Sequence, residues 1–406
     1  MKKPLFTLLF LLLFSFNFSI SLSAQIKPNT FLMNGELLLQ NKLKIAANDE
    51  PCLAARRIIV YAATPILTRE PYTIVNKTIA PLSGDTHDYM SLAPYWWPNP
   101  NTATGLPYIR KDGQTNPQVN EVKDNSYLQA LSQDVRLLGL AYFYTNEEKY
   151  AQKATELLEV FFLNSATRMN PNLKYAQTIR GDLTVYGTCT VDSEHLPELL
   201  DGVQLLVGSK SWTSTKHEAL KNWFSEYLTW MLTSEWGKKA SNAPNNIGTY
   251  YDLQVITYAL FVGNKTLAKA LIEKQTFPRI ETQLGVNGEQ VLELVRTNAW
   301  TYCNKNLDGW FSLASVAESA GINLWDYTST SGKSLKKALQ WMLPYGAKTK
   351  VWPYQQIGLF KPEYLTPMAR VASAIYKDLK LDTQLSATHT RFVAGAYLEL
   401  LTSRYQ

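Results

Sequence analysis

The sequence predicts an all-α protein, folded as an incomplete (α/α) toroid or barrel. Apolar residues recur at helical spacing in roughly a dozen segments, whereas segments of alternating polarity are few. The loops between these segments are alternately short and long, which is typical of antiparallel helix pairs. We therefore expect the long loops to gather on one face and to form a cleft there.

The start of the chain predicts a secretory signal peptide over residues 1–24. Two lysines precede an apolar run at 5–14, and 21–24 supplies small residues for cleavage. We expect the mature chain to begin near Gln25, where no cysteine could carry a lipid anchor. No later segment is apolar for long enough to span a bilayer, so we expect a periplasmic or secreted protein. Residues 25–406 contain no Gly/Ser- or Pro-rich linker, which favours one domain.

Helical periodicity defines the elements in order. The first segments are 36–44 and 52–62, and Pro51 suits the first turn of the second. Two amphipathic segments, 126–144 and 147–163, follow across a short turn. Later helices are expected at 195–207, 215–233, 265–275, 309–320, 333–342, 362–376 and 389–401.

Two irregular stretches, 81–125 and 170–192, interrupt the helices. The first is rich in Pro, Gly, Asn, Asp and aromatic residues, and it carries Trp96 and Trp97 side by side. A loop this long in a compact domain is usually functional. We expect at least one of the two indoles to be buried, as in a structural loop.

Composition narrows the class of protein. With 11 Trp and 23 Tyr residues, many beside polar neighbours, the chain suits a cleft that stacks on sugar rings. The net charge of +6 is mild and spread along the chain, which fits a polyanionic substrate or a plain solvated surface rather than a nucleic acid. Cys52, Cys189 and Cys303 leave at least one thiol unpaired and show no metal-ligand spacing, so we expect no disulfide framework, metal or cofactor.

The stretch 241–254 is rich in asparagine and leads directly into apolar residues at helical spacing. Asn, Pro and Gly in such density favour a turn and a helix start near Asn246. Because helix N-termini favour anions, a carboxylate or phosphate can lie beside the Asn246 amide. The alternative is that Asn245 or Asn246 only caps the helix.

A second informative run spans residues 288–307. Arg296, Trp300 and Tyr302 lie among other polar residues here, where a structural helix would show an apolar stripe. We therefore expect this run to form part of a site.

The motifs together resemble the alginate lyase-like polysaccharide lyases, helical toroids that cleave uronate polymers by β-elimination. The resemblance covers most of the mature chain. It is carried by His87-Asp88-Tyr89, Pro94-Tyr95-Trp96-Trp97-Pro98, Asn245-Asn246-x-Gly248-Thr249-x-Tyr251-Asp252, Arg296-Thr297-x-x-Trp300-x-Tyr302 and Leu324-Trp325-x-Tyr327. Members of this family place an Asn, often followed by His, beside the substrate carboxylate and use a Tyr for proton transfer.

The chemistry explains these residue types. Removing H5 of a uronate requires the adjacent carboxylate to be neutralised, which calls for amide or guanidinium donors such as Asn246 and Arg296. A base must take H5, and an acid must protonate the O4 leaving group. A tyrosine base needs a cationic surround, since its ordinary pKa is about 10, and Arg296 and Lys305 lie near Tyr302 in the sequence.

One position departs from the family pattern, because Ile247 follows Asn246 where histidine is usual. Elimination from mannuronate or glucuronate takes H5 and O4 from the same side, so Tyr302 alone can serve as base and acid. We therefore expect syn elimination on a β-linked mannuronate- or glucuronate-type polymer. His195 or His87 would be needed for the anti reaction on guluronate, unless each is only a structural histidine.

Other residues are expected to bind substrate. Tyr250 follows Asn246 by one helical turn and so shares its face, while Asn245, Arg180 and Lys305 are polar candidates. The aromatic loop adds sugar-stacking candidates. The expected substrate-binding set is His87, Tyr95, Trp96, Trp97, Arg180, Asn245, Tyr250 and Lys305.

Two other classes of protein remain as alternatives. A helical-toroid glycoside hydrolase needs two carboxylates that flank the scissile bond. The candidates form no recognisable pair in the sequence: Asp85, Asp88, Glu121, Asp252, Glu289 and Glu293. A non-catalytic exported glycan-binding protein would share the aromatic composition, although such proteins are commonly anchored by a lipidated cysteine.

Overall fold

The structure is a computed structural model that describes residues 27–377 and 400–401. Helices dominate the described chain, and its two small sheets have only two strands each, so the predicted all-α toroid is confirmed. The expected signal peptide at 1–24 and most of the expected helix at 389–401 lie outside the described residues. None of the described helices is long and apolar enough to cross a membrane.

The first half of the helical framework follows the predicted order. Asn34 and Asp49 cap the first two helices by accepting hydrogen bonds from backbone N–H groups of the following turn. Asn146 takes the left-handed conformation after the third helix, which produces the predicted short turn. These helices are α1 (Gly35–Ala46), α2 (Glu50–Ala63), α3 (Asp124–Thr145), α4 (Glu148–Leu158), α5 (Leu196–Leu205), α6 (Ser214–Thr233) and α7 (Glu235–Ser241).

Two predicted boundaries in the second half were wrong. The helix expected at 309–320 begins ten residues earlier, so residues 299–304 of the polar run form its first turns. The helix expected at 265–275 continues through a π-helical turn into α10. The remaining helices are α8 (Asn246–Phe261), α9 (Lys265–Leu271), α10 (Phe277–Gln283), α11 (Val291–Leu294), α12 (Ala299–Ala320), α13 (Leu335–Gly346) and α14 (Thr366–Ile375).

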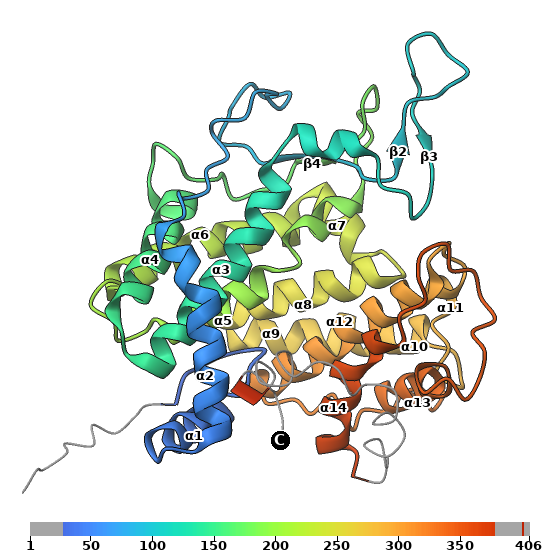
Figure 1. Ribbon diagram of the computed structural model, residues 1–406. Helices are drawn as coiled ribbons and strands as arrows, with labels where there is room; N and C mark the ends of the chain where they lie inside the picture. The colour runs from blue at the N-terminus through green and yellow to red at the C-terminus, as the bar shows by residue number, and fades with distance from the viewer. Residues whose placement is uncertain (1–26, 378–399, 402–406) are drawn as a thin grey trace, which may run out of the picture.

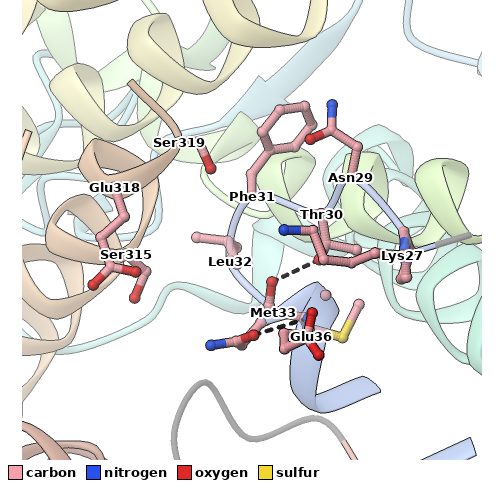
Figure 2. Close-up of a pocket in the computed structure, with 13 residues that line it drawn as sticks. Lys27, Asn29, Thr30, Phe31, Leu32, Met33, Glu36, Ser315, Glu318 and Ser319 are labelled. Atoms are coloured by element: carbon pink, nitrogen blue, oxygen red, sulfur yellow. Dashed lines mark hydrogen bonds between the residues drawn. The ribbon is translucent and has the colours of Figure 1, made fainter. Parts of the chain in front are cut away.

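The N-terminal segment is fixed to α5 by one buried carboxylate. The backbone N–H groups of Phe31, Leu32 and Met33 donate to Asp201, and burial raises the pKa of Asp201 to about 6. A cavity of about 410 Å³ lies between this segment and the last turns of α12, where Ser315 and Glu318 face it (Figure 2).

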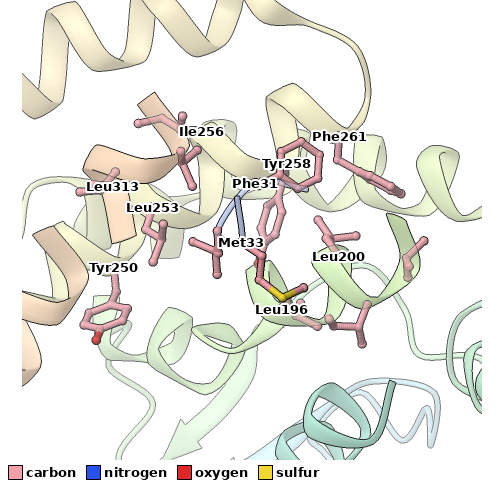
Figure 3. Close-up of a cluster of buried hydrophobic side chains, with 14 of the residues drawn as sticks. Phe31, Met33, Leu196, Leu200, Tyr250, Leu253, Ile256, Tyr258, Phe261 and Leu313 are labelled. Atoms are coloured by element: carbon pink, nitrogen blue, oxygen red, sulfur yellow. The ribbon is translucent and has the colours of Figure 1, made fainter. Parts of the chain in front are cut away.

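Helix α8 forms the centre of the core. It is buried on nearly every side, because α12, α9, α6, α7 and α5 all pack against it. Figure 3 shows apolar side chains of α5, α8, α12 and the N-terminal segment meeting there, among them Leu196, Leu200, Leu253, Ile256, Leu313 and Phe31. A helix buried in this way holds its N-terminus rigidly at the end of the toroid.

The two irregular stretches lie together at one end of the helices, as predicted (Figure 1). Strand β1 (Met90–Leu92) of the first stretch pairs in parallel with β4 (Tyr175–Thr178) of the second. Strands β2 (Trp96–Trp97) and β3 (Ile109–Arg110) form an antiparallel hairpin beside them. This pairing brings residues far apart in the sequence to the same face as the N-termini of α8 and α12.

All three cysteines are free and buried. Burial raises the pKa of the Cys52 thiol to about 11, which leaves it protonated and unreactive. No disulfide joins any two of the three cysteines in the structure.

Candidate active site

Arg296, just before α12, and Tyr302, in its first turn, are in direct contact. The guanidinium carbon of Arg296 lies 3.6 Å from the centroid of the Tyr302 ring. The Tyr302 hydroxyl lies 2.6 Å from the hydroxyl of Tyr95, at the start of the β2–β3 hairpin. A cation, an aromatic ring and two phenolic hydroxyls thus form one cluster.

Asp112 holds Arg296 in this position. The guanidinium donates through Nε and Nη2 to the Asp112 carboxylate, at 2.7 Å for the shortest bond. Burial alone would raise the pKa of Asp112, but the hydrogen bonds from Arg296 and from Thr297 outweigh it and lower the pKa to about 2. Gly113 makes this approach possible, because a Cβ there would lie 2.7 Å from the Thr297 hydroxyl and Gly113 has a positive φ.

The phenol of Tyr302 is not an easy base in this structure. Burial raises its pKa well above the ordinary value, and the hydrogen bond with Tyr95 raises it further. The charge of Arg296 acts in the opposite direction, as predicted from the sequence, but it does not outweigh burial. Arg296 therefore supplies the positive charge expected beside Tyr302. It does not bring the pKa of Tyr302 below its ordinary value, although the sequence predicts such a lowering.

Asn246 is directed at a buried carboxylate. Its side-chain amide donates to both oxygens of Glu293 at 2.9 Å each, and its backbone N–H donates to the same carboxylate at 2.7 Å. Burial raises the pKa of Glu293, while the Asn246 hydrogen bonds and the charges of Arg296 and Lys305 act against the rise. An anion does lie at the start of α8, and it is a side chain of the protein itself.

Asn245 is the residue that caps α8, where the sequence allowed either Asn245 or Asn246. Its side chain accepts a hydrogen bond from the Ile247 backbone N–H, so Asn246 is the first residue of α8. Tyr250, one turn later, is 9% exposed and its hydroxyl donates to the Lys305 carbonyl oxygen. Tyr250 thus packs between α8 and α12, and its expected contact with substrate stays a prediction.

Lys305 and His195 meet at another carboxylate. Lys305 Nζ lies 2.8 Å from Glu194 Oε1, and His195 Nε2 lies 3.8 Å from the same oxygen. The second oxygen of Glu194 is buried and has no hydrogen-bond partner in the part of the chain that the structure describes. The charge of Lys305 also acts to lower the pKa of Glu293. The group of Glu194, Lys305 and His195 therefore lies beside the Asn246–Glu293 pair.

The other expected substrate-binding residues lie farther along the loop face. The Trp97 indole N–H donates to the Gln114 carbonyl oxygen, and Trp96 lies 6.5 Å from the Tyr186 ring. Both indoles are half-buried, which agrees in part with the expected burial. Arg180 forms an ion pair with Glu121, and His87 Nδ1 bonds the Arg168 carbonyl oxygen at 2.7 Å. Arg180 and His87 therefore have partners of their own, and their role stays a prediction.

The structure gives no pair of carboxylates suited to hydrolysis among the candidates. Asp252 forms a buried ion pair with Arg279, and Glu289 accepts from Asn287. Glu121 pairs with Arg180, and Asp88 accepts hydrogen bonds from Ser83 and Asn170. Within residues 27–377 and 400–401 there is also no group of three or more His, Cys, Asp or Glu side chains placed to hold a metal ion.

The cavity beside the N-terminal segment (Figure 2) lies away from this cluster. Ser315 lines that cavity, and it follows Tyr302 by 13 residues on the same helix. A helix rises about 1.5 Å per residue, so the two positions are roughly 20 Å apart along α12. This cavity and the cluster of chemical groups are therefore at opposite ends of the helix, and the cluster is the better candidate site.

Comparisons with known proteins agree with this geometry. The alginate lyase family model matches residues 73–352. The solved structure of an alginate lyase from Bacteroides ovatus is 36% identical, with a TM-score of 0.87 over 93% of this chain and 99% of that chain. The chain belongs to the alginate lyase family. It is therefore a polysaccharide lyase, and the family implies an anionic polysaccharide substrate.

More distant members share the fold. Alginate lyase A1-III from Sphingomonas species A1 is 14% identical, with a TM-score of 0.52 over 85% of this chain and 94% of that chain. A variant of alginate lyase A1-III complexed with a tetrasaccharide is 14% identical, with a TM-score of 0.55 over 86% and 94%. A comparison with curated proteins found no match.

Family membership confirms the resemblance stated from the motifs and decides against the hydrolase and the non-catalytic alternatives. The sequence reasoning for this alginate lyase family member missed Asp112 as the partner of Arg296. It considered Glu293 only as a hydrolase carboxylate, and Tyr95 only as a stacking ring. Asp112 follows Arg110 in a polar loop, and nothing in its neighbourhood singles it out.

Proposed function

We propose that this polysaccharide lyase cleaves a β-linked mannuronate-type polymer, as in alginate, by syn β-elimination, with glucuronan as the next candidate. The observation that carries the proposal is the contact of Tyr302 with both the Arg296 guanidinium and the Tyr95 hydroxyl. This contact places a proton-transfer group, Tyr302, and a cation, Arg296, in one cluster.

Arg296 is the group best placed to neutralise the substrate carboxylate. Its Nε and Nη2 are used by Asp112, and no hydrogen bond of Nη1 is seen within the described residues. The Asn246 amide nitrogen lies 2.9 Å from both oxygens of Glu293, so one amide hydrogen is shared between them. The first role of Asn246 is therefore to hold Glu293 beside Arg296.

Tyr302 takes H5 as the phenolate and then gives the proton to O4. The C5–H and C4–O4 bonds break, a C4=C5 double bond forms, and the phenolate is regenerated, so the step balances without another reactant. Because burial raises the pKa of the resting phenol, its phenolate is scarce at neutral pH. The Arg296 charge then stabilises the anion that forms.

The same-side geometry follows from using one tyrosine for both proton transfers. His195 lies beside Glu194 and Lys305 rather than against Tyr302, which leaves Tyr302 as the proton-transfer candidate in contact with Arg296. His87, bonded to the Arg168 carbonyl oxygen, is a less suitable second group. We also propose that residues 1–24 direct export, so that the enzyme meets polymer outside the cytoplasm.

The experiment is a product assay with defined polymers. Mannuronan, guluronan, glucuronan and a glycosaminoglycan are incubated with the enzyme, and the ultraviolet absorbance of the conjugated double bond is followed. We expect absorbance with mannuronan, weaker absorbance with glucuronan and none with guluronan. Guluronan cleaved faster than mannuronan would contradict the syn mechanism.

A further inference from the structure

A second aromatic hollow lies on the loop face, beyond the β2–β3 hairpin. It measures about 200 Å³ and is lined by β4, the loop at 182–186 and the first turn of α7. Its ring-bearing walls are Tyr175, Tyr186 and Trp236, and Lys174 stands at its edge. None of these four residues belongs to the site described above.

The positive charge of Lys174 in this hollow is available to pair with a ligand anion. Lys174 is exposed, and its ammonium lies 5.4 Å from the Tyr175 ring and 5.8 Å from the Trp236 ring. Within the described residues it makes no ion pair or side-chain hydrogen bond. Asp182 also lines the hollow, but its carboxylate accepts hydrogen bonds from the Thr184 backbone N–H and the Tyr186 hydroxyl.

The walls are held in place before any ligand arrives. Lys239 Nζ donates to the Val185 carbonyl oxygen and fixes the loop to α7. Gly187 packs so closely on α7 that a Cβ would lie 2.5 Å from the Ala240 backbone nitrogen. A preformed hollow binds a ligand without the cost of ordering a loop.

One wall of the hollow borders the aromatic side of the hairpin. Tyr186 forms one of its walls and also lies 6.5 Å from the Trp96 ring. Trp96 is adjacent in sequence to Tyr95, and successive strand residues point to opposite faces. The hairpin therefore directs Tyr95 to Tyr302 and Trp96 to Tyr186.

We propose that this hollow is a distal subsite for one uronate residue of a long chain, with Lys174 on its carboxylate and Trp236 and Tyr186 against its ring. The inference rests on the proposed function, because a polymeric uronate is the ligand. Aromatic rings supply apolar contact with a sugar face, and a lysine at the rim supplies the charge that a uronate needs.

Such a subsite affects long substrates only. We expect Lys174→Ala and Trp236→Ala to raise KM about 5–10-fold for long mannuronate oligosaccharides, which corresponds to about 1–1.4 kcal/mol. KM for the shortest cleaved oligosaccharide and kcat for both should stay close to wild type. Lys238→Ala is the control for loss of an exposed charge beside the hollow, and Tyr61→Ala is the control for loss of an exposed ring elsewhere.

Binding to the Tyr302→Phe protein separates this inference from the proposed chemistry. In that background, equilibrium titration should show that Lys174→Ala weakens binding of long oligosaccharides about 5–10-fold while short ones bind equally well. The same titration decides the matter even if the wild-type protein forms no unsaturated product. Equal affinity of the Lys174 and Trp236 variants and their controls for long chains would overturn the subsite, as would an equal loss for short and long chains.

Discussion

The guanidinium of Arg296 lies over the ring of Tyr302, with its central carbon 3.6 Å from the ring centroid. Asp112 holds the guanidinium by hydrogen bonds from Nε and Nη2. A cation so placed can lower the cost of a phenolate and still present Nη1 to a substrate carboxylate. The first prediction tests whether activity needs the planar shape of the Arg296 guanidinium and not only its charge.

Arg296→Lys keeps the charge but loses the planar fork that serves Asp112 and stacks on the ring. We expect kcat/KM to fall about 10²–10³-fold, the size typical of losing a preorganised charge donor. Arg110→Lys is the matched control, because Arg110 also contacts Asp112 at 2.6 Å but has a side chain that is 51% exposed. Equal losses in the two variants, measured by steady-state kinetics, would count against the role of the stack.

Tyr95→Phe removes the hydroxyl that raises the pKa of Tyr302. Activity needs the phenolate, so kcat/KM should rise with pH below that pKa. In the variant the rising limb should move to lower pH, because the hydrogen bond that disfavours the phenolate is lost. Tyr108→Phe, whose hydroxyl donates to Gln118 in the same hairpin, should leave the profile unchanged. A Tyr95→Phe profile that matches wild type would contradict the coupling.

Asn246→Asp places a second carboxylate against Glu293. Two buried anions at this distance repel each other, so we expect a loss of about 2–4 kcal/mol in the free energy of unfolding at neutral pH. Adding Glu293→Gln exchanges the positions of the amide and the carboxylate. The double variant should regain most of the lost free energy of unfolding. Urea unfolding of the single and double variants measures this, and a double variant less stable than Asn246→Asp alone would show that the pair is not what matters.

Asp201 gives the fold a distinct pH dependence. Its folded pKa, about 6, is raised above the ordinary value of 3.8 by burial. Its stabilising contribution is therefore fully present below pH 3.8 and is lost as the pH rises through 6. Relative to Asp201→Asn, the wild-type protein should lose up to about 3 kcal/mol of unfolding free energy across this window. Urea unfolding at several pH values checks this, and a difference that does not vary with pH would contradict it.

Much of the framework follows from local sequence. The Asn-rich stretch predicts the start of α8 because Asn245 can cap a helix whose next turn is apolar. The β-pairing that joins β1 to β4 links residues some 85 positions apart, and no local pattern encodes it. What the sequence predicts is therefore most of the longer helices, and not which loops meet above them.

Prediction of the site from the sequence is limited in the same way. Arg296 and Tyr302 are close in sequence, and their residue types predict a shared role. The Asp112 contact spans 184 positions and the Tyr95 contact 207, so both depend on tertiary structure. The raised pKa of Tyr302 follows from burial, which sequence patterns in a polar, aromatic run underestimate.

The central claim is that Tyr302 transfers both protons. The most direct measurement is the initial rate of unsaturated product from mannuronan with wild-type protein and Tyr302→Phe, each at saturating substrate. The account predicts a loss of at least about 10³-fold in kcat, with folding and polymer binding retained, because the substitution removes one hydroxyl whose contact is with Tyr95. Product formation by Tyr302→Phe at a near-wild-type rate would contradict it.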